Sequence, residues 1–490
     1  MNTMAIYERL PISAQQAIVS YYGRKLHRMR FGGFHDDERE RIRAGDRMDA
    51  ASMRAVQVER MRAILAEAVA HVPYWREAER LEPLAKLARS LRDPSEIEIL
   101  PPLEKKTINA DPARFHSSSP GGKPIYGNTS GTTGRPLRTM KTAESYQRNW
   151  AHYQATKELH GVRMGMRRAT FGTRMVVPTR QRKLPFWRFE PAENNVYFSL
   201  FHLSEEFLPS YVEKLLEWKP EEVVCFPSAL TVLAEHMVRR GVQLTGVHAV
   251  FALSETLFDW QRERIATAMG AKVVNVYGLA ENVAWIFECP EGRHHVRPDY
   301  GYTELLPSRT DLGATPYDDE GEVREIVSTG FLNRAMPLLR YRTRDQAIVG
   351  PRDAEPCACG LRFPTVTRVI GRLDDNLVTP DGRVQTRLDG IFKGIGGVRE
   401  SQLEQTALDR LIVRVVPSEG YGPAWEEEVR TRIRRIFTDR MQVEVQLVPE
   451  LPRTRAGKVR YQVNSIPAGL RNVAAIGATP PGGASAEAPR

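Results

Sequence analysis

Short apolar runs alternate with amphipathic stretches over the middle of the chain. The apolar runs cover residues 222–226, 247–252 and 272–277, and the amphipathic stretches cover residues 231–240 and 260–269. Apolar runs of this length predict strands that are buried on both faces, and the stretches between them predict helices. The alternation therefore predicts an α/β domain with a parallel sheet.

The two ends of the chain follow other patterns. Residues 36–92 are rich in Arg, Glu, Ala and Leu, with apolar residues at helical spacing, which predicts a helical start. A smaller α+β unit begins near residues 371–375, with strands expected at 411–416 and 443–448 around a helix at 424–440.

These patterns predict the fold class and the domain limits. We expect an α/β protein whose large N-terminal domain, residues 1–371, has mixed and parallel sheets flanked by helices. A small, mobile α+β lid should follow at residues 372–466. The last stretch, residues 467–490, is dominated by Ala, Gly and Pro and is expected to be disordered.

Composition narrows the class of protein. The chain has 490 residues, of which 41% are hydrophobic and 27% charged, as in globular proteins with more than one core. The first residues lack the apolar region of a secretory signal, and no later run approaches the roughly 18 apolar residues that span a membrane. We therefore expect a cytoplasmic protein with no membrane partner.

The net charge of +10 comes from 70 basic and 60 acidic residues, with excess arginine in the first fifty residues and at 163–188. No nucleic-acid-binding motif accompanies the charge, so we expect no nucleic-acid partner. Solvated faces account for it, and an anionic substrate or an acidic carrier protein remains an alternative.

A polar loop is the first candidate site, and its residues are Thr129, Ser130, Gly131, Thr132, Thr133 and Gly134. Glycine frees the backbone to turn several N–H groups and hydroxyls toward one anion, which suits a polyphosphate. The chain has no Walker loop. Taken alone, the loop is also compatible with an ordinary polar turn.

Three later side chains could complete a nucleotide site. Tyr277 and Glu281 follow a predicted strand, where a ring can stack on a purine and a carboxylate can hold Mg²⁺. Asp345 can accept hydrogen bonds from both hydroxyls of a ribose. Lys458, on a loop that contains glycine, is a point charge suited to an α-phosphate. Singly, each of them could equally be a core or surface residue.

Five segments in this order resemble the adenylate-forming superfamily of acyl-CoA synthetases, peptide-synthetase adenylation domains and luciferases; they are residues 129–134, 275–281, 340–345, 370–375 and 451–458. Within it, the phenylacetate-CoA ligase and coenzyme F390 synthetase-like branch is the most similar. Residues 71–75, 100–105 and 226–228 carry that closer resemblance.

The resemblance implies a role for each segment around ATP. The loop at 129–134 would bind the phosphates, Tyr277 the adenine and Glu281 the magnesium ion, with Gly278 also among the cofactor-binding residues. Magnesium and ATP are thus the implied cofactors. Glu281 would also be catalytic.

The later segments would complete the nucleotide site and allow the lid to move. The resemblance implies that Asp345 and Arg372 bind the ribose, that Asp374 is the interdomain hinge and that Lys458 promotes adenylation. Arg372 and Lys458 are therefore also catalytic candidates. Since the lid of the family rotates between two half-reactions, Lys458 should lie at the site only during the first.

Three departures from the family pattern bear on function. Ala280 replaces the usual hydroxyl residue before the glutamate, which removes one phosphate contact, and Arg344 replaces the usual glycine. Residues 377–384 read as a hairpin with a Pro-Asp-Gly turn, where typical CoA ligases have a glycine-rich loop that lines the pantetheine tunnel. This third departure leaves the acceptor open.

Four side chains could form a structural zinc site. Cys357 and Cys359 make a tight two-thiol unit, and Cys289 offers a third thiol with His295 nearby. Three thiolates and one imidazole make a closed tetrahedral set, although buried inert cysteines have a similar sequence signature. Some members of the resembled branch carry a comparable arrangement, which favours structural Zn²⁺ and favours His295 over His294 as the ligand.

The resemblance implies ATP-dependent adenylation of a small, aromatic carboxylate with release of pyrophosphate, followed by transfer to the thiol of CoA or a carrier protein. The altered loop at 377–384 leaves two alternatives: an amide-forming ligase with an amine acceptor, or unusual oxyanion activation such as ATP-dependent nitrite or diazotisation chemistry. Ala280 leaves a third, a catalytically reduced nucleotide-binding regulatory protein.

Overall fold

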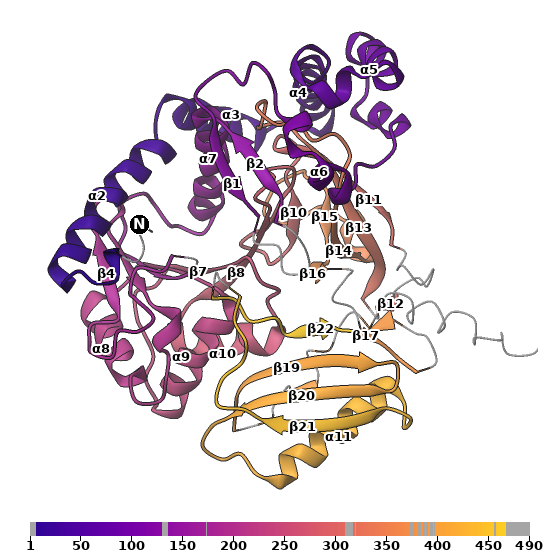
Figure 1. Cartoon of the computed structure of the whole chain (residues 1–490). Coiled ribbons are helices and arrows are strands. Elements are labelled where there is room, and N and C mark those ends of the chain that lie inside the picture. The colour runs from indigo at the N-terminus through magenta and orange to yellow at the C-terminus, as the bar shows by residue number, and fades with distance from the viewer. Residues whose placement is uncertain are drawn as a thin grey trace, which may run out of the picture.

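The computed structural model describes residues 6–129, 136–172, 174–308, 317–318, 320–372, 377–380, 384–385, 388, 391–392, 395, 397–454 and 457–466, with the backbone alone at positions 317, 318, 372 and 384. A large region with two main sheets lies above a smaller sheet with one helix (Figure 1). Within the described residues, no helix is both long and apolar enough to cross a membrane. The predicted tail at 467–490 lies outside them, and the predicted domain limits stay predictions.

A nine-stranded sheet forms the centre of the large region, in the order β15-β10-β9-β8-β7-β6-β3-β5-β4. Its strands are β3 (Arg168–Phe171), β4 (Trp187–Glu190), β5 (Asn195–Phe198), β6 (Glu222–Cys225), β7 (Ala249–Leu253), β8 (Lys272–Gly278), β9 (Trp285–Glu288), β10 (His294–Val296) and β15 (Thr365–Val366). The strands β5, β3, β6, β7 and β8 pair in parallel, whereas both ends of the sheet are antiparallel.

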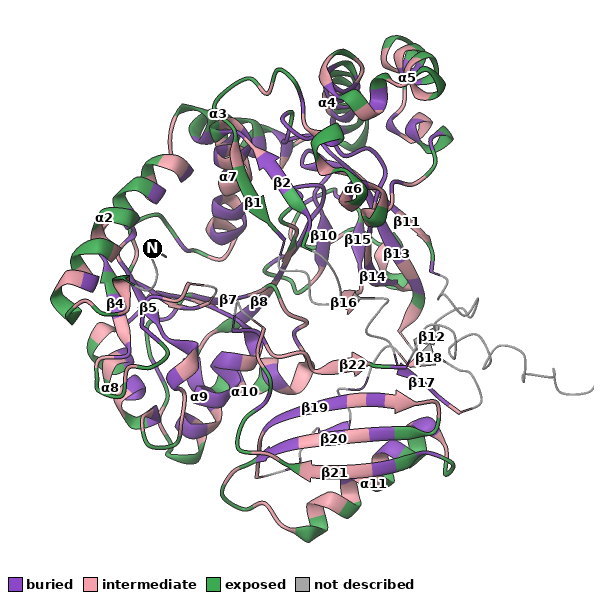
Figure 2. Ribbon diagram, in the orientation of Figure 1, coloured by how far each residue is buried: buried purple, intermediate pink, exposed green. Residues whose placement is uncertain are grey.

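The three predicted parallel strands correspond to β6, β7 and β8, whose apolar residues are mostly buried. Helices α7 (Ala143–Leu159), α8 (Leu208–Trp218), α9 (Pro227–Arg239) and α10 (Asp259–Met269) connect or cover the strands. The helix α9 begins four residues before the predicted stretch, because Pro227 has the fixed φ that suits a first helical turn. Figure 2 shows the strands as mainly buried and the outer helix faces as exposed.

A second sheet has the order β11-β13-β14-β16, with β12 paired to β13. Its strands are β11 (Gly301–Pro307), β12 (Tyr317–Asp318), β13 (Gly321–Gly330), β14 (Tyr341–Val349) and β16 (Arg368–Arg372). All these pairings are antiparallel, and β14 pairs with β16 so that Asp345 lies opposite Arg372. This sheet therefore brings two predicted site residues into register.

The predicted helical start is confirmed as α3 (Gly33–Gly45), α4 (Ala50–His71) and α5 (Ala78–Ser90). Asp49 caps α4 by accepting a hydrogen bond of 2.7 Å from the Ser52 N–H. A preceding helix, α2 (Ile12–Arg30), had not been predicted. The short elements nearby are η1 (Pro73–Arg76), η2 (Pro94–Ile99), α6 (Lys105–Ala110), η3 (Pro112–Phe115), the hairpin β1 (Ile125–Asn128) and β2 (Arg138–Lys141), η4 (Pro191–Glu193), η5 (Leu200–His202) and η6 (Pro351–Ala354).

The smaller sheet, called the lid sheet below, has the order β21-β20-β19-β22. It consists of β19 (Val398–Ala407), β20 (Arg410–Pro417), β21 (Gln442–Leu447) and β22 (Gln462–Asn464), and α11 (Pro423–Phe437) covers it. The strand β20, the helix α11 and the strand β21 lie where the sequence predicts them. The predicted hairpin also forms, as β17 (Leu377–Val378) paired with β18 (Val384–Gln385). A separate apolar core under α11 supports the lid as a packed unit.

Candidate functional site

A cavity of about 340 Å³ lies at the carboxyl ends of β7 and β8. Ligands of open α/β sheets bind at this edge, because the loops that follow the strands meet there. The large region and the lid both contribute to its walls; the lining includes Thr129, Ser228, Ser254, Glu255, Tyr277, Gly278, Ala280, Glu281, Asp345, Arg399, Glu400 and Lys458. The cavity is therefore an interface between two separately built units.

Tyr277 and Asp345 meet in this cavity although they are far apart in sequence. Tyr277 is the last residue but one of β8, and its hydroxyl donates a hydrogen bond of 2.7 Å to Oδ2 of Asp345 on β14. Burial first, and the nearby Asp345 second, raise the pKa of Tyr277 well above its usual value, so the hydroxyl remains a donor. The bond fixes the carboxylate at the wall of the cavity.

The residue after Tyr277 has to be small. Gly278 pairs with Trp285 of β9, and a Cβ at Gly278 would lie only 2.7 Å from a ring carbon of Trp285. Any larger residue would push this strand end out of place. The packing of Trp285 against this strand therefore explains why a glycine lines the cavity at this position.

Glu281 is also held in place. Its side chain is buried, and Oε1 accepts a hydrogen bond of 3.0 Å from the hydroxyl of Tyr341. Ala280 lies beside it in the wall of the cavity and brings no polar atom. The predicted magnesium ligand thus has a fixed orientation, while the position of the usual hydroxyl is apolar.

Lys458 reaches the cavity from the lid. Its Nζ donates a hydrogen bond of 2.9 Å to the backbone carbonyl of Ser254 and lies 5.3 Å from the ring centre of Phe226. The preceding Gly457 has a φ of 83° and packs against Leu200, which a Cβ would approach to 3.2 Å. The loop therefore docks with its lysine directed inward.

Two charged residues near the site had not been predicted. Glu255 lines the cavity and accepts hydrogen bonds of 3.0 Å from both the backbone N–H and the hydroxyl of Ser228, and burial raises its pKa. Lys141, at the end of β2, donates a bond of 2.9 Å to Oδ1 of Asn282. Burial lowers the pKa of Lys141 to about 8, although the carboxylate of Glu281 acts in the opposite direction. No motif marks either residue, so only the fold could reveal them.

The structure describes the remaining predicted site residues to different extents. The Thr129 N–H donates a hydrogen bond of 3.0 Å to the Leu137 carbonyl, and the Thr129 hydroxyl accepts one of 2.9 Å from the Leu137 N–H, at the base of the predicted phosphate loop. The rest of that loop, residues 130–134, and Asp374 lie outside the described residues. Arg372 is described through its backbone alone, opposite Asp345.

Arg344 shows why the family has a glycine at this position. Its φ is 61°, in the left-handed region that glycine adopts without strain and other residues adopt at a cost of roughly 1 kcal/mol. The backbone conformation that glycine favours is therefore retained with an arginine in its place. Arg344 lies where the pairing of β14 with β13 shifts register, between Arg342 and Gln346.

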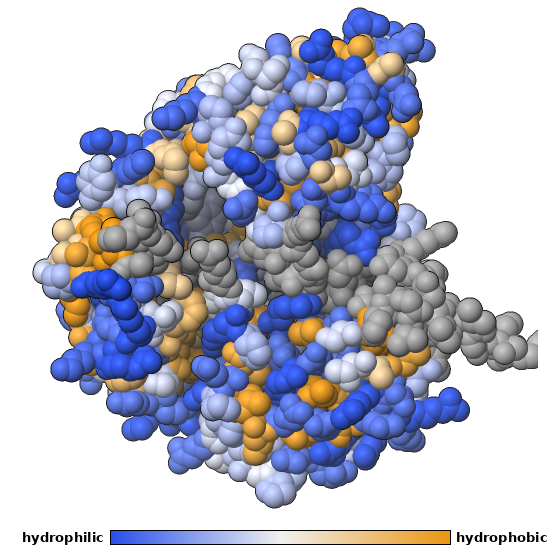
Figure 3. All heavy atoms as spheres, viewed as in Figure 1, coloured by the Kyte–Doolittle hydropathy of each residue, from blue (hydrophilic) through white to orange (hydrophobic). Residues whose placement is uncertain are grey.

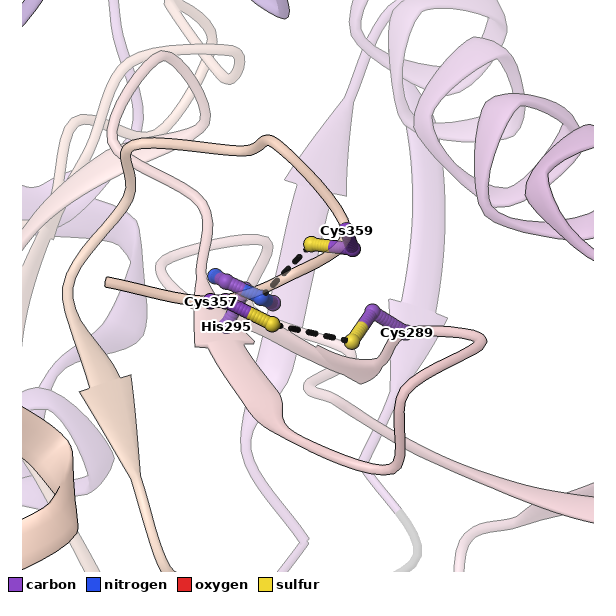
Figure 4. A group of neighbouring side chains, drawn as sticks. All are labelled: Cys289, His295, Cys357 and Cys359. Atoms are coloured by element: carbon purple, nitrogen blue, oxygen red, sulfur yellow. Dashed lines mark hydrogen bonds between the residues drawn. The ribbon is translucent and has the colours of Figure 1, made fainter. Parts of the chain in front are cut away.

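The four predicted zinc ligands form a compact cluster (Figure 4). Cys289 follows β9, His295 belongs to β10, and Cys357 with Cys359 lies on the loop that leads to β15, the next strand of the same sheet edge. One ligand atom from each of the four residues lies within 4.8 Å of all the others. The Sγ atoms of Cys289 and Cys357 are 3.7 Å apart, and Sγ of Cys359 is 3.3 Å from Nε2 of His295.

Two tight turns shape this cluster. The N–H of Gly292 bonds to the carbonyl of Cys289, and the N–H of Gly360 bonds to that of Cys357, with φ values of 79° and 84° at the two glycines. Each turn directs its thiol toward His295, which lies between β9 and β15 in the sheet. The chemistry of this donor set, soft thiolates with one imidazole, fits Zn²⁺.

The chain has relatives over nearly its whole length. It is 25% identical to the protein CapK of Staphylococcus aureus over 466 residues, which cover 94% of this chain and 99% of that protein. Residues 377–465 match the family described as CapK C-terminal domain. A phenylacetate-coenzyme A ligase of Thermus thermophilus is 29% identical over 279 residues, which span 50% of this chain and 60% of that ligase.

Solved structures share the fold. A 2-hydroxyisobutyryl-CoA ligase in its postadenylation state has a TM-score of 0.62 at 19% identity, with 86% of this chain and 91% of that chain covered. The same ligase in its thioesterification state gives 0.50.

The relatives and the shared fold confirm the sequence-based predictions of the superfamily, of the fold class and of an AMP-forming ligase as the enzyme class. The hairpin of β17 and β18 lies within the residues that match the CapK C-terminal domain. The chain is therefore similar to CapK over nearly its whole length and to phenylacetate-coenzyme A ligases over half of it, and it has the fold of the adenylate-forming superfamily.

Proposed function

We propose that this AMP-forming ligase activates a small aromatic carboxylate as an acyl adenylate and then transfers the acyl group to a thiol. One observation carries the proposal: Lys458 of the lid lies in the same cavity as Tyr277, Asp345 and Glu281. These are the groups that adenine, ribose, Mg²⁺ and the α-phosphate would need, and they come from separate parts of the chain. A phenylacetate-coenzyme A ligase among the relatives supports the aromatic carboxylate.

The first half-reaction would be a displacement at phosphorus. A carboxylate oxygen of the substrate attacks the α-phosphorus of ATP, the bond to the β-phosphate oxygen breaks, and pyrophosphate leaves. Lys458 would stabilise the negative charge that builds on the α-phosphate, because a fixed cation in a partly dehydrated site interacts more strongly than one in water. Its bond to the Ser254 carbonyl helps to hold it at the cavity.

The nucleotide would be oriented by fixed groups. Asp345, held by Tyr277, would accept hydrogen bonds from the ribose, with Arg372 beside it, while Thr129 to Gly134 would cover the phosphates. Glu281, held by Tyr341, would hold Mg²⁺, which would neutralise charge on the phosphate oxygens. Such groups lower the barrier because they are oriented before the reaction begins.

The acceptor is proposed as the thiol of CoA or of a carrier protein. In the second half-reaction the thiolate would attack the acyl carbon and AMP would leave. The hairpin of β17 and β18 favours an amine or an unusual oxyanion such as nitrite as the alternative, because it replaces the glycine-rich loop of typical CoA ligases. Asp374 is proposed as the hinge of the lid.

Pyrophosphate exchange tests the first half-reaction. The protein with ATP, Mg²⁺ and a panel of aryl and alkyl carboxylates should exchange labelled pyrophosphate into ATP with at least one acid. ATP binding without exchange against the whole panel would instead support a regulatory protein, the alternative raised by Ala280. Adding CoA or hydroxylamine to the preformed adenylate then distinguishes a thiol from an amine acceptor.

We propose structural Zn²⁺ at Cys289, His295, Cys357 and Cys359. Four protein ligands would leave no open position for substrate, so the ion would join β9, β10 and the loop before β15 and would take no part in catalysis. Metal analysis of protein purified without chelators should find one zinc per chain. A Cys289–Cys357 disulfide with no zinc would contradict the proposal.

A further inference from the structure

The outer face of α2 carries apolar and basic side chains together. Ile18, Tyr21, Lys25 and Arg28 follow at helical spacing on one side of the helix, with Tyr22 beside them. Tyr21 is 71% exposed, Tyr22 52% and Ile18 42%. These five residues are called the α2 face below. Large side chains with this exposure call for a partner, because solvent contact of clustered apolar groups is unfavourable.

The opposite side of α2 is firmly attached to the protein. The side-chain amide of Gln16 donates a hydrogen bond to the Phe189 carbonyl of β4, and its oxygen accepts one of 3.0 Å from the Phe189 N–H. Gly23 packs on Glu190. The guanidinium of Arg30 pairs with Glu193 at 2.5 Å. The α2 face is therefore presented by a rigid element, and its exposure does not come from a loosely packed end.

The surface continues beyond α2. Arg188 links the segment at 179–184 to the start of α2, since its guanidinium donates hydrogen bonds to both Gln15 and Gln181. This segment adds the exposed side chains of Arg182, Lys183 and Leu184. Figure 3 shows apolar side chains next to strongly hydrophilic ones on the left edge of the molecule, where α2 and β4 lie in Figure 1.

The charge of this surface has one sign. Helix α2 contains no Asp or Glu, and neither does the stretch 163–188, which contains eight Arg and Lys residues. Glu193 pairs with Arg30 and Glu8 lies 4.0 Å from Arg180, while Glu190 is buried and accepts hydrogen bonds from backbone N–H groups. A second copy of the chain would bring like charges together, which is unfavourable.

We propose that the α2 face and residues 182–184 bind an anionic lipid surface. Aliphatic and aromatic side chains can enter the boundary between headgroups and acyl chains, while Lys and Arg remain with the phosphates. Nucleic acid matches the charge but offers no apolar phase for Ile18 and Leu184. The sequence-based expectation of no membrane partner rests on the lack of a spanning segment. The α2 helix would lie on the membrane surface without crossing the bilayer.

Vesicle co-sedimentation tests the proposal. The full chain should bind vesicles of phosphatidylcholine mixed with phosphatidylglycerol, should bind pure phosphatidylcholine weakly, and should be released by salt. The double variant Lys25→Glu/Arg28→Glu should bind about tenfold more weakly or worse, since each cation near an anionic membrane contributes about 1 kcal/mol. Tyr21→Ser/Tyr22→Ser should weaken binding at every salt concentration.

A matched control is Arg434→Glu/Arg435→Glu on α11, which makes the same charge change at exposed positions of the lid. It should bind mixed vesicles as wild type does, and all variants should keep the thermal midpoint and the pyrophosphate exchange rate of wild type. Equal loss with the α11 control, or no binding to mixed vesicles at low salt, overturns the proposal. Binding to a single-stranded oligonucleotide in preference to vesicles would identify a nucleic-acid surface instead.

Discussion

The proposed nucleotide cavity and the cysteine cluster both involve strands of the nine-stranded sheet, but one is open and the other is closed. At the cavity, polar side chains from β8, β14 and the lid surround open space, and the Lys458 ammonium donates a hydrogen bond to the Ser254 carbonyl. At the cluster, four ligand atoms lie within 4.8 Å of one another at the β9-β10-β15 edge. Open space lined by polar groups suits turnover, whereas a closed set of donors suits stability. Variants at the two places should therefore change different measurements.

The largest effect is expected from Lys458→Ala. Loss of a charge that acts on the α-phosphate should lower the rate of pyrophosphate exchange about 10²- to 10³-fold, with the thermal midpoint unchanged. Exchange kinetics and thermal unfolding of the same preparation measure both. The matched control, Arg434→Ala, removes an exposed cation of the lid and should leave both values as in wild type. Wild-type exchange by Lys458→Ala would remove the lysine from the mechanism.

The next largest effect is expected from Asp345→Ala, which should weaken the binding of ATP. Loss of charge-assisted bonds to the ribose is expected to raise the KM for ATP about 10- to 100-fold. Tyr277→Phe removes the 2.7 Å bond that orients this carboxylate and should cost less. In the double variant the Tyr277 change should add little, because its effect acts through Asp345. Simple additivity would show that Tyr277 and Asp345 act independently.

Cys357→Ser should lower the stability of the protein and leave its kinetics with ATP nearly unchanged. The variant should lose zinc and show a thermal midpoint several degrees lower, because metal binding contributes to folding free energy. Its KM for ATP at a temperature well below the midpoint should remain within about twofold of wild type, because four protein ligands would leave no role for the ion in turnover. Cys225→Ala, a buried cysteine outside the cluster, serves as the control and should retain zinc. A loss of exchange with zinc and stability intact would break the contrast between the two regions.

The smallest effect concerns Lys141, beside Glu281. Burial lowers its pKa to about 8, so the amine loses its proton as the pH rises through that value. If its charge assists the phosphates, the KM of wild type for ATP should rise several-fold above about pH 8. Lys141→Arg keeps its charge at all these values and should flatten the profile. Identical profiles for both proteins would assign Lys141 a structural role.

Prediction from sequence succeeded where the signal was local. The apolar runs that became β6, β7 and β8 needed only short stretches to be recognised, and the order of Tyr277, Asp345 and Lys458 along the chain identified the superfamily. It missed α2, whose apolar and basic residues do not form a clean amphipathic pattern. It also missed Lys141 and Glu255, because neither lies in a motif.

The sequence by itself determined the α/β class, the superfamily and the residue types available for chemistry, because these depend on periodicity and on motifs within short segments. Only the tertiary structure decided that Tyr277 bonds to Asp345 across two sheets, that Lys458 reaches Ser254 from the lid, and that the α2 face points outward. Such contacts join residues that are 68 to 204 positions apart. Their geometry depends on the packing of whole sheets, which no local pattern contains.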